Sequence, residues 1–258
     1  MQRERIRDVI LVSRSEVSLL LTIMPETGSN IYPRQKNDGI SIQVGLSGYS
    51  FVVSSDGVRK SSGWTGIDRI FTAPEFQRRY QRVDISVFTP KFTLVPSQFH
   101  CPQQSRAILS EVVDLEDGDS VDYVAIPSLA ATMVFSLSNG GTLHKVLSET
   151  VLLTDGSKAT PLPEAYYMLK CLDSLTEYNK IVASYVDGYL YLVIAQGKSL
   201  LLCNSFEAVD FTTAEYFIFL AMKRLQLNIE ASSIYFRTEL SPEQEISLYR
   251  YFKNVERI

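Results

Sequence analysis

The sequence contains few cysteines and histidines, the residues that form disulfides or bind metal ions in many small domains. Its 258 residues include three cysteines (Cys101, Cys171 and Cys203) and two histidines. Because the cysteines are odd in number and far apart, they predict reduced thiols in a cytoplasmic protein and not a disulfide framework. His100 and Cys101 are adjacent, but they lack the C-x-x-C or H-x-x-x-H spacing of zinc ligands. No metal site is therefore expected.

An excess of charge of one sign is also missing. The net charge is −4 and the isoelectric point lies near 5.4, so the charge balance does not favour nucleic acid or an anionic lipid surface as a partner. Hydrophobic residues make up 45% of the chain and charged residues 21%, which is typical of a globular protein with a full core. The composition predicts a folded protein with no nucleic-acid partner.

No hydrophobic run is long enough to span a membrane. Residues 9–12 and 17–24 are apolar, but a Ser-Arg-Ser-Glu segment separates them, and a span needs about 20 apolar residues. No small-x-small cleavage site follows, so the pattern does not predict an export signal. We expect residues 1–39 to form an N-terminal extension of strands and loop, and the protein to have no transmembrane segment.

The sequence does contain one segment that occurs twice. Residues 47–57 and 187–197 match at a constant offset of 140, and an apolar run precedes each of them. A Ser-Gly or Asp-Gly between two β-rich runs predicts a hairpin, because glycine tolerates the positive φ of the primed turns. The matched pairs are Gly48 with Gly188, Tyr49 with Tyr189, Val53 with Val193, and Gly57 with Gly197.

The second half reads as three strands followed by two helices with a strand between them. After the hairpin, residues 200–206 predict a third strand, and Thr213 is expected to cap a helix that ends at residue 227. Residues 233–236 predict a strand. Ser241-Pro242 predicts the start of a final helix that ends near residue 255. An amphipathic helix over residues 164–175 precedes this unit.

The first half repeats this order with additions. Residues 58–66 predict a weak third strand, residues 74–82 a short helix, and residues 83–88 and 92–95 two strands. Beyond them we expect a helix within 97–113, a strand at 121–126 and a helix at 128–138. The fold class is therefore α/β, with a first lobe at residues 40–155, a second at 156–258, and a cleft between the hairpin turns.

Several of these features resemble known families. The repeated hairpin stands where the actin-like ATPase superfamily has its two phosphate-binding hairpins; that superfamily contains actin, heat-shock ATPases, sugar kinases, PilM and GspL. The residues Leu-Cys-Asn-Ser-Phe at 202–206, the helix at 213–227, and Pro96 after Phe-Thr-Leu-Val resemble an uncharacterised bacterial family of this fold. The resemblance covers residues 40–255 and implies a duplicated ribonuclease-H-like fold.

The resemblance also implies a nucleotide site that can be compared residue by residue. Active members carry Asp-x-Gly at the end of the first strand of each half, where the carboxylates hold Mg²⁺ and the glycine turn meets the phosphates. The matching tripeptides here are Gln43-Val44-Gly45 and Ser184-Tyr185-Val186, and Arg237-Thr238-Glu239 stands in place of the adenosine-binding Gly-Gly. If a nucleotide binds, the resemblance assigns it to Gly45, Ser47, Gly48, Asp187 and Gly188.

These departures favour a protein without catalysis or cofactor. We expect an interaction or scaffold module with a degenerate nucleotide site and a protein partner. The alternative is an ATP-binding switch or slow Mg-dependent ATPase, in which Ser47-Gly48 and Asp187-Gly188 serve as phosphate turns. A ribonuclease-H-type nuclease is a third possibility, but the first strand of neither half carries the central carboxylate that its two metal ions need.

Overall fold

The computed structural model describes residues 38–67, 73–138 and 142–258. The N-terminal extension of strands and loop that we expect at residues 1–39 lies almost entirely outside these residues. Among the described residues, no helix is long and apolar enough to cross a membrane.

A mixed sheet forms the first lobe. Its strands run in the order β3-β2-β1-β5-β9, and β4 pairs with β2. β1 is antiparallel to β2 and parallel to β5, so the hairpin leads into a crossover unit. The last strand, β9, lies beyond the expected lobe boundary at 155/156. The bounds are β1 Gly39–Val44, β2 Gly48–Ser55, β3 Val58–Ser61, β4 Thr65–Gly66, β5 Arg82–Val87 and β9 Leu162–Pro163.

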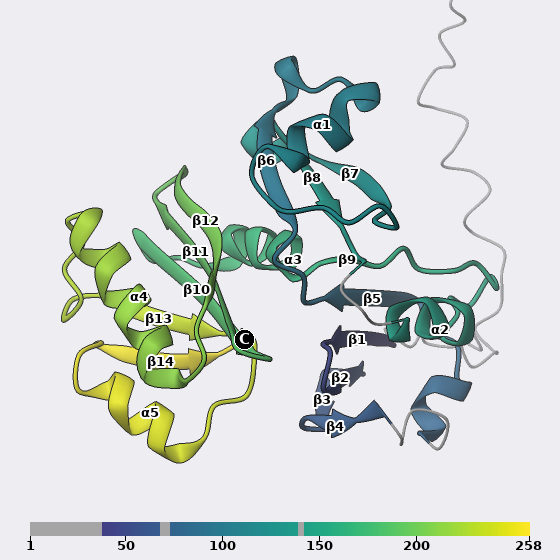
Figure 1. Cartoon of the computed structure of the whole chain (residues 1–258). Helices are drawn as coiled ribbons and strands as arrows, with labels where there is room; N and C mark the ends of the chain where they lie inside the picture. The colour runs from purple at the N-terminus through teal and green to yellow at the C-terminus, as the bar shows by residue number, and fades with distance from the viewer. Residues whose placement is uncertain (1–37, 68–72, 139–141) are drawn as a thin grey trace, which may run out of the picture. The chain divides into compact units, whose positions relative to one another are not determined.

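The second lobe contains a sheet with the same order of strands. This sheet runs β12-β11-β10-β13-β14, with β10 antiparallel to β11 and parallel to β13 (Figure 1). The repeated order and directions confirm the duplicated α/β fold. The bounds are β10 Asn179–Val186, β11 Tyr189–Gln196, β12 Ser199–Glu207, β13 Ser233–Phe236 and β14 Asn254–Arg257.

The two hairpins differ in the length of their turns. In the first, Val44 pairs with Tyr49, so four residues form the turn. In the second, Val186 pairs with Tyr189, and only Asp187 and Gly188 lie between the strands. Tyr49 and Tyr189 therefore keep the sequence offset of 140. In β1 and β10, which precede these residues, the offset between equivalent positions is larger by two residues.

Helices cover both sheets. In the first lobe, α2 (Leu143–Thr150) and the 3₁₀ helix η2 (Pro74–Gln77) share one hydrophobic core with β1, β2 and β5. In the second, α4 (Phe211–Arg224) and α5 (Pro242–Tyr249) pack on one face of the sheet. The opposite face packs against α3 (Glu164–Cys171).

A third sheet is inserted between β5 and α2. It consists of β6 (Phe92–Pro96), β8 (Ala131–Ser136) and β7 (Val121–Ile126), with β8 in the centre, and α1 (Ser105–Ser110) lies beside it. The helix expected at 128–138 is wrong, because this segment contains β8. A central strand buried on both faces gives a continuous apolar run, which periodicity does not separate from a buried helix.

Three further expectations about helices need correction. The final helix ends at Tyr249, and the chain then forms β14 as a parallel neighbour of β13. The cap of α4 is Asp210, whose Oδ1 accepts from the Thr213 N–H at 2.7 Å, so Thr213 is the donor. The short helix at 74–82 is a 3₁₀ turn followed by β5. The cap at Ser241 is confirmed, with Pro242 in the first turn.

Candidate functional site

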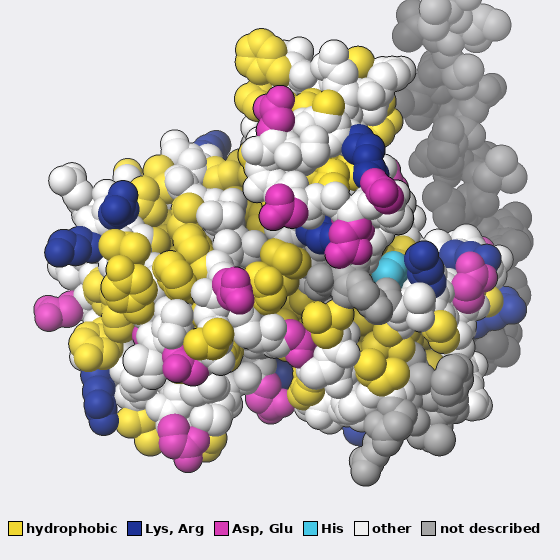
Figure 2. Space-filling view, in the orientation of Figure 1, with side chains coloured by type: hydrophobic (Ala, Val, Ile, Leu, Met, Phe, Trp, Pro, Cys, Tyr) yellow, Lys and Arg dark blue, Asp and Glu magenta, His cyan; other side chains and the backbone are white. Residues whose placement is uncertain are grey.

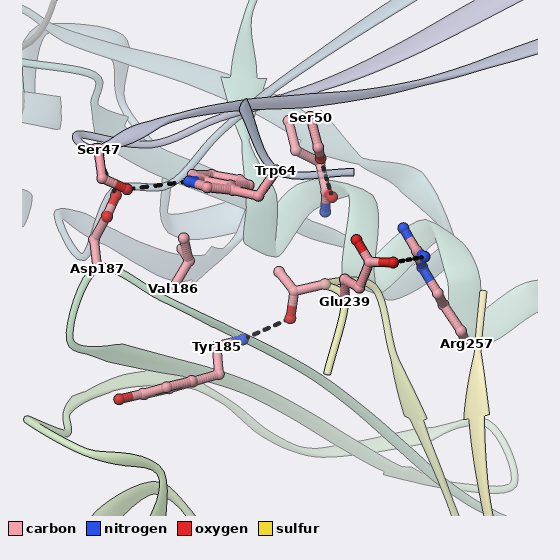
Figure 3. Close-up of a pocket in the computed structure, with 10 residues that line it drawn as sticks. Ser47, Ser50, Trp64, Tyr185, Val186, Asp187, Glu239 and Arg257 are labelled. Carbon is pink, nitrogen blue, oxygen red and sulfur yellow. Dashed lines mark hydrogen bonds and ion pairs between the residues drawn. The ribbon is translucent and has the colours of Figure 1, made fainter. Parts of the chain in front are cut away.

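A cavity of about 250 Å³ lies where the two hairpin turns meet (Figure 3). The first lobe contributes Ser47, Ser50 and Trp64 to its lining, and the second contributes Tyr185 and Asp187, among others. This volume is below the range of about 300–1,000 Å³ that ligand pockets usually have. The cavity occupies the position of the expected cleft, but it is small.

The second hairpin turns at Asp187-Gly188. Both residues have positive φ, 51° and 75°, as a type I′ turn requires, and the Asp-Gly dipeptide is a common sequence for that turn. A two-residue turn holds the Asp187 side chain close to the strand ends, so its carboxylate points away from its own sheet towards the first hairpin.

The carboxylate of Asp187 binds the turn of the first hairpin. Its Oδ2 accepts from the backbone N–H of Leu46 at 2.6 Å and from that of Ser47 at 3.3 Å. Successive N–H groups in a turn form a concavity that binds anions. The N–H of Gly45 donates to the carbonyl of Gly48 at 2.9 Å and closes the same turn. The anion site of the first hairpin therefore contains a carboxylate from the second.

Close packing explains the two glycines of the first turn. A Cβ on Gly45 would collide with Asp187 Oδ2, and a Cβ on Gly48 would collide with the carbonyl oxygen of Thr65. Trp64 lies over the turn, and its Nε1 donates to Ser47 Oγ at 3.2 Å (Figure 3). These glycines are needed because side chains and backbone of the protein itself approach them.

The rim of the cavity carries an ion pair between the end of β14 and the loop that follows β13. Arg257 Nη1 lies 3.1 Å from Glu239 Oε1, and Arg257 Nη2 donates to Ser61 Oγ of the first lobe at 3.3 Å. With Asp187, the charged residues among the described part of the lining are two acids and one base. Such an arrangement of charge disfavours a polyanion such as a nucleoside triphosphate.

Behind the cavity, a buried carboxylate joins the two lobes. Glu164, in the first turn of α3, has no exposed surface. From the first lobe, its Oε1 accepts from Gln43 Nε2 at 3.0 Å, and its Oε2 accepts from Ser86 Oγ. From the second lobe, Oε1 accepts from Ser184 Oγ and Arg237 Nε, both at 2.8 Å.

At the two positions where the resemblance places metal-binding carboxylates, the side chains form hydrogen bonds with another residue of the protein. Gln43 and Ser184 lie at those positions, and both donate to Glu164. Among the described residues, no group of three or more His, Cys, Asp or Glu side chains is placed to hold a metal ion. The arrangement can hold two lobes together through one carboxylate; it offers no set of anionic ligands for Mg²⁺.

The structure brings together the five residues that the sequence assigned to a nucleotide. Gly45, Ser47 and Gly48 form the first turn, Asp187 and Gly188 form the second, and Asp187 joins the two. Sequence reasoning missed Glu164 and Trp64. The partners of Glu164 are far away along the chain, with a sequence separation of 121 residues from Gln43. Trp64 lies 17 residues from Ser47, and no local motif marks either residue.

Solved structures with the same architecture have low sequence identity to this chain. A protein from Bacteroides thetaiotaomicron with an actin-like ATPase fold and unknown function has a TM-score of 0.64 and 16% identity, over 90% of this chain and 94% of that one. This likeness shows that the chain has the actin-like ATPase fold.

Two more distant structures are also similar. A chain of the PilM–PilN type IV pilus biogenesis complex has a TM-score of 0.48 and 12% identity, over 85% of this chain and 88% of that one. The ethanolamine utilization protein EutJ from Carboxydothermus hydrogenoformans has a TM-score of 0.39 and 10% identity, over 87% and 85%.

In sequence, no curated protein matches the chain significantly. One family profile does match, over residues 31–255, and its description is "Protein of unknown function (DUF3822)". The matched region includes both hairpins, the inserted sheet and the residues around Glu164. The chain belongs to the DUF3822 family.

Proposed function

We propose that this protein is a non-catalytic interaction module with an actin-like fold, in which one of the protein's own carboxylates occupies the anion site of the first hairpin turn. The observation that carries the proposal is the contact of Asp187 Oδ2 with the Leu46 N–H at 2.6 Å. A phosphate entering the first turn would have to displace this carboxylate and would then lie beside it. Both the lost hydrogen bonds and the repulsion between like charges oppose binding.

The proposal also rests on the contacts behind the cleft. Phosphoryl transfer needs Mg²⁺ held against the phosphates by anionic oxygens. Gln43 and Ser184 are neutral and donate to Glu164, so they already have a structural role. A fold that keeps its lobes joined in this way retains its surface for binding another protein. Exposed apolar side chains are available in the inserted region: Tyr123 on β7, Phe99 in the 3₁₀ turn after β6, and Val112 just beyond α1.

Thermal denaturation with and without Mg-ATP tests the proposal. A ligand at one hundred times its dissociation constant stabilises the folded state by about 2.7 kcal/mol, which for a chain of this size raises the melting temperature by several degrees. We expect no shift for the wild type and no Mg-dependent phosphate release. A shift together with turnover that is lost in Asp187→Asn would establish the slow ATPase instead.

A variant that removes the carboxylate makes the test sharper. In Asp187→Gly the turn keeps a residue that accepts positive φ, while the N–H groups of Leu46 and Ser47 become free. We expect this variant to bind pyrophosphate more tightly than the wild type in calorimetry. Asp56→Gly is the matched control, because Asp56 also has positive φ before a glycine but does not line the cavity. Equal binding by the wild type and Asp187→Gly would contradict the proposal.

A further inference from the structure

The inserted sheet and its loops carry the whole net charge of the chain. Residues 91–136 contain six acids and two bases, and this difference equals the net charge of −4 of the full sequence. The rest of the chain contains 23 acids and 23 bases, from totals of 29 and 25. Figure 2 shows acidic side chains beside hydrophobic ones on the inserted part, at the top of the view. The charge of the protein is therefore concentrated on one part of its surface.

Both bases of this region make contacts within it. Lys91 Nζ lies 2.8 Å from Oδ2 of the buried Asp119. Arg106 donates through Nη1 to the carbonyl of Asp119 at 2.6 Å and through Nη2 to the carbonyl of Glu116 at 3.0 Å. The Glu116 N–H in turn donates to Asp119 Oδ2 at 3.0 Å. The two bases therefore fix the loop before β7 and neutralise one acid.

The other five acids of the region are exposed. None of them forms an ion pair with any residue that the structure describes. Exposed like charges that lie close together repel one another, and a cationic partner would relieve this repulsion. Four of these acids precede β7 and one lies on it: Glu111, Asp114, Glu116, Asp117 and Asp122.

β7 itself is an edge strand. β8 pairs with one side of it, and no strand within the described ranges pairs with the other. In an antiparallel pair, successive residues turn their backbone N–H and C=O groups alternately towards the neighbouring strand and away from it. The Tyr123 N–H donates to Asp122 Oδ1 at 2.7 Å, so Tyr123, and with it Val121 and Ala125, faces away from β8. Such outward backbone groups are a template for an added strand.

The side chains of β7 determine which strand fits beside it. Asp122 and Tyr123 point to opposite faces of the sheet, because side chains alternate along a strand. Tyr123 is 45% exposed and its ring centroid lies 4.7 Å from that of His100; the preceding residue, Phe99, is 68% exposed. An added strand would thus meet apolar side chains on one face and a carboxylate on the other.

The same charge disfavours a second copy of this chain as the partner. Two β7 strands paired edge to edge would bring two acidic surfaces together, and like charges opposite each other in a sheet are destabilising. Charged side chains on edge strands also protect proteins against pairing with themselves. Asp122 therefore acts against self-association and in favour of a basic strand.

We propose that β7 binds an extended segment of a partner protein in which lysine or arginine alternates with apolar residues. Its backbone pairs with the outer edge of β7, its basic side chains lie beside Asp122 and the acids of residues 111–117, and its apolar side chains pack on Tyr123. This inference rests on the proposed function, because it names the chemistry of the partner that the interaction module would bind.

Fluorescence anisotropy with labelled peptides tests the proposal. The probe is a capped peptide of alternating lysine and valine with six residues, the length of β7. It should bind the wild type about tenfold or more tightly than the same peptide with glutamate in place of lysine. N-methylation of every second residue removes the N–H groups from one edge of the peptide, and should weaken binding about tenfold or more if the peptide binds as a strand.

Charge reversal on the protein locates the binding site. Asp122→Lys should weaken binding of the lysine peptide about tenfold and strengthen binding of the glutamate peptide, because it reverses the charge at the edge of β7. Glu256→Lys is the matched control, since Glu256 is an exposed acid on β14, the edge strand of the second sheet. This variant should bind the lysine peptide as the wild type does. Circular dichroism identifies any variant that has lost its fold.

Several results would overturn the proposal. Equal affinity for the lysine and glutamate peptides would do so, as would wild-type affinity in Asp122→Lys or equal weakening by Glu256→Lys. Undiminished binding of the N-methylated peptide would show electrostatic adsorption without strand pairing. These titrations contain no nucleotide, so they are independent of the Mg-ATP test: Mg-dependent turnover would refute the proposed function and leave the strand pairing at β7 standing.

Discussion

The two lobes have the same strand order but opposite roles at the cleft. The first hairpin has a four-residue turn whose N–H groups donate hydrogen bonds to an anion; the second has a two-residue turn that supplies this anion, the carboxylate of Asp187. In the first, the glycines are required by the close approach of other atoms, whereas Gly188 is required by its φ of 75°. A duplicated element can therefore keep its fold while its two copies become complementary to each other.

This complementarity explains why sequence similarity between the hairpins does not imply a shared ligand. Gly48 and Gly188 match in the sequence, yet a Cβ on Gly48 would collide with the backbone of Thr65, whereas Gly188 stands in a type I′ turn where a Cβ would make only an ordinary contact with the Ala208 carbonyl oxygen at 3.9 Å. What the copies share is the sheet behind them. The difference arises from two residues of turn length, which shift the first strand of each hairpin relative to the second.

The largest expected effect comes from breaking the contact that both lobes share. Glu164→Ala would leave Arg237 buried without a counter-charge and would remove the acceptor of Gln43, Ser86 and Ser184. Removing one partner of a buried ion pair typically costs about 3–5 kcal/mol. Urea denaturation should show this loss in the free energy of unfolding.

Glu149→Ala provides the control for that measurement. Glu149 pairs with Lys158 on the surface, where both side chains are more than half exposed. Surface ion pairs contribute about 0–1 kcal/mol, so this variant should remain close to the wild type. If Glu164→Ala behaved like Glu149→Ala, the buried carboxylate would not join the lobes energetically.

Glycine substitutions should destabilise the two hairpins for different physical reasons, dihedral strain at Gly188 and steric collision at Gly48. Gly188→Val forces a β-branched residue to positive φ and should cost about 1–3 kcal/mol. Gly57→Val should cost a similar amount, because Gly57 has a φ of 84° in the turn between β2 and β3. Denaturant midpoints measure both.

Gly48→Ala completes this comparison between the hairpins. It tests close approach and not dihedral strain, since the added methyl would meet the Thr65 carbonyl. Thr65→Ala cannot relieve this clash, because the Thr65 atom that the added methyl group meets is the backbone carbonyl oxygen. An unchanged midpoint for Gly48→Ala would show that β2 and β4 are not packed as described.

The smallest effect concerns pH and belongs to the first lobe. Burial, and secondarily the neighbouring Lys145, lowers the pKa of His144. The folded state therefore binds this proton less readily than the unfolded chain, whose histidine pKa is about 6.5. The free energy of unfolding should fall as the pH drops below that value, by at most about 1.4 kcal/mol per pH unit.

His144→Gln should remove this part of the pH dependence. Both histidines of the chain lie before residue 156, so residues 156–258 contain no equivalent group. The fluorescence of Trp64, the single tryptophan, reports on the first lobe during denaturation between pH 5 and 7. The same slope in the wild type and in His144→Gln would show that another group is responsible.

The hairpins, the repeated lobes and the cap at Ser241 were predictable because local rules determine them. Asp187-Gly188 specifies its turn, and Ser241-Pro242 specifies a helix start regardless of what packs on it. β8 was not predictable, because Met133, Val134 and Phe135 are buried on both faces of the inserted sheet. A run of that kind has no periodicity that separates strand from helix.

The candidate site was predictable in position but not in its contacts. The sequence located both turns, but the partner of Asp187 depends on how two lobes meet, which no spacing encodes. Glu164 looked like an ordinary acid in the first turn of a helix. Its burial follows from donors at residues 43, 86, 184 and 237, which converge only in the folded chain.

The carboxylate of Glu164 also has a consequence for how the chain folds. Its donors come from both ends of the described sequence, so they can assemble only after both sheets exist, and contacts of such long sequence separation form late and slowly. Neither half, expressed alone, could satisfy the buried polar groups that the other half completes. The two copies of the repeat should therefore unfold in one cooperative transition, and this protein should behave as a single folding unit in spite of its internal duplication.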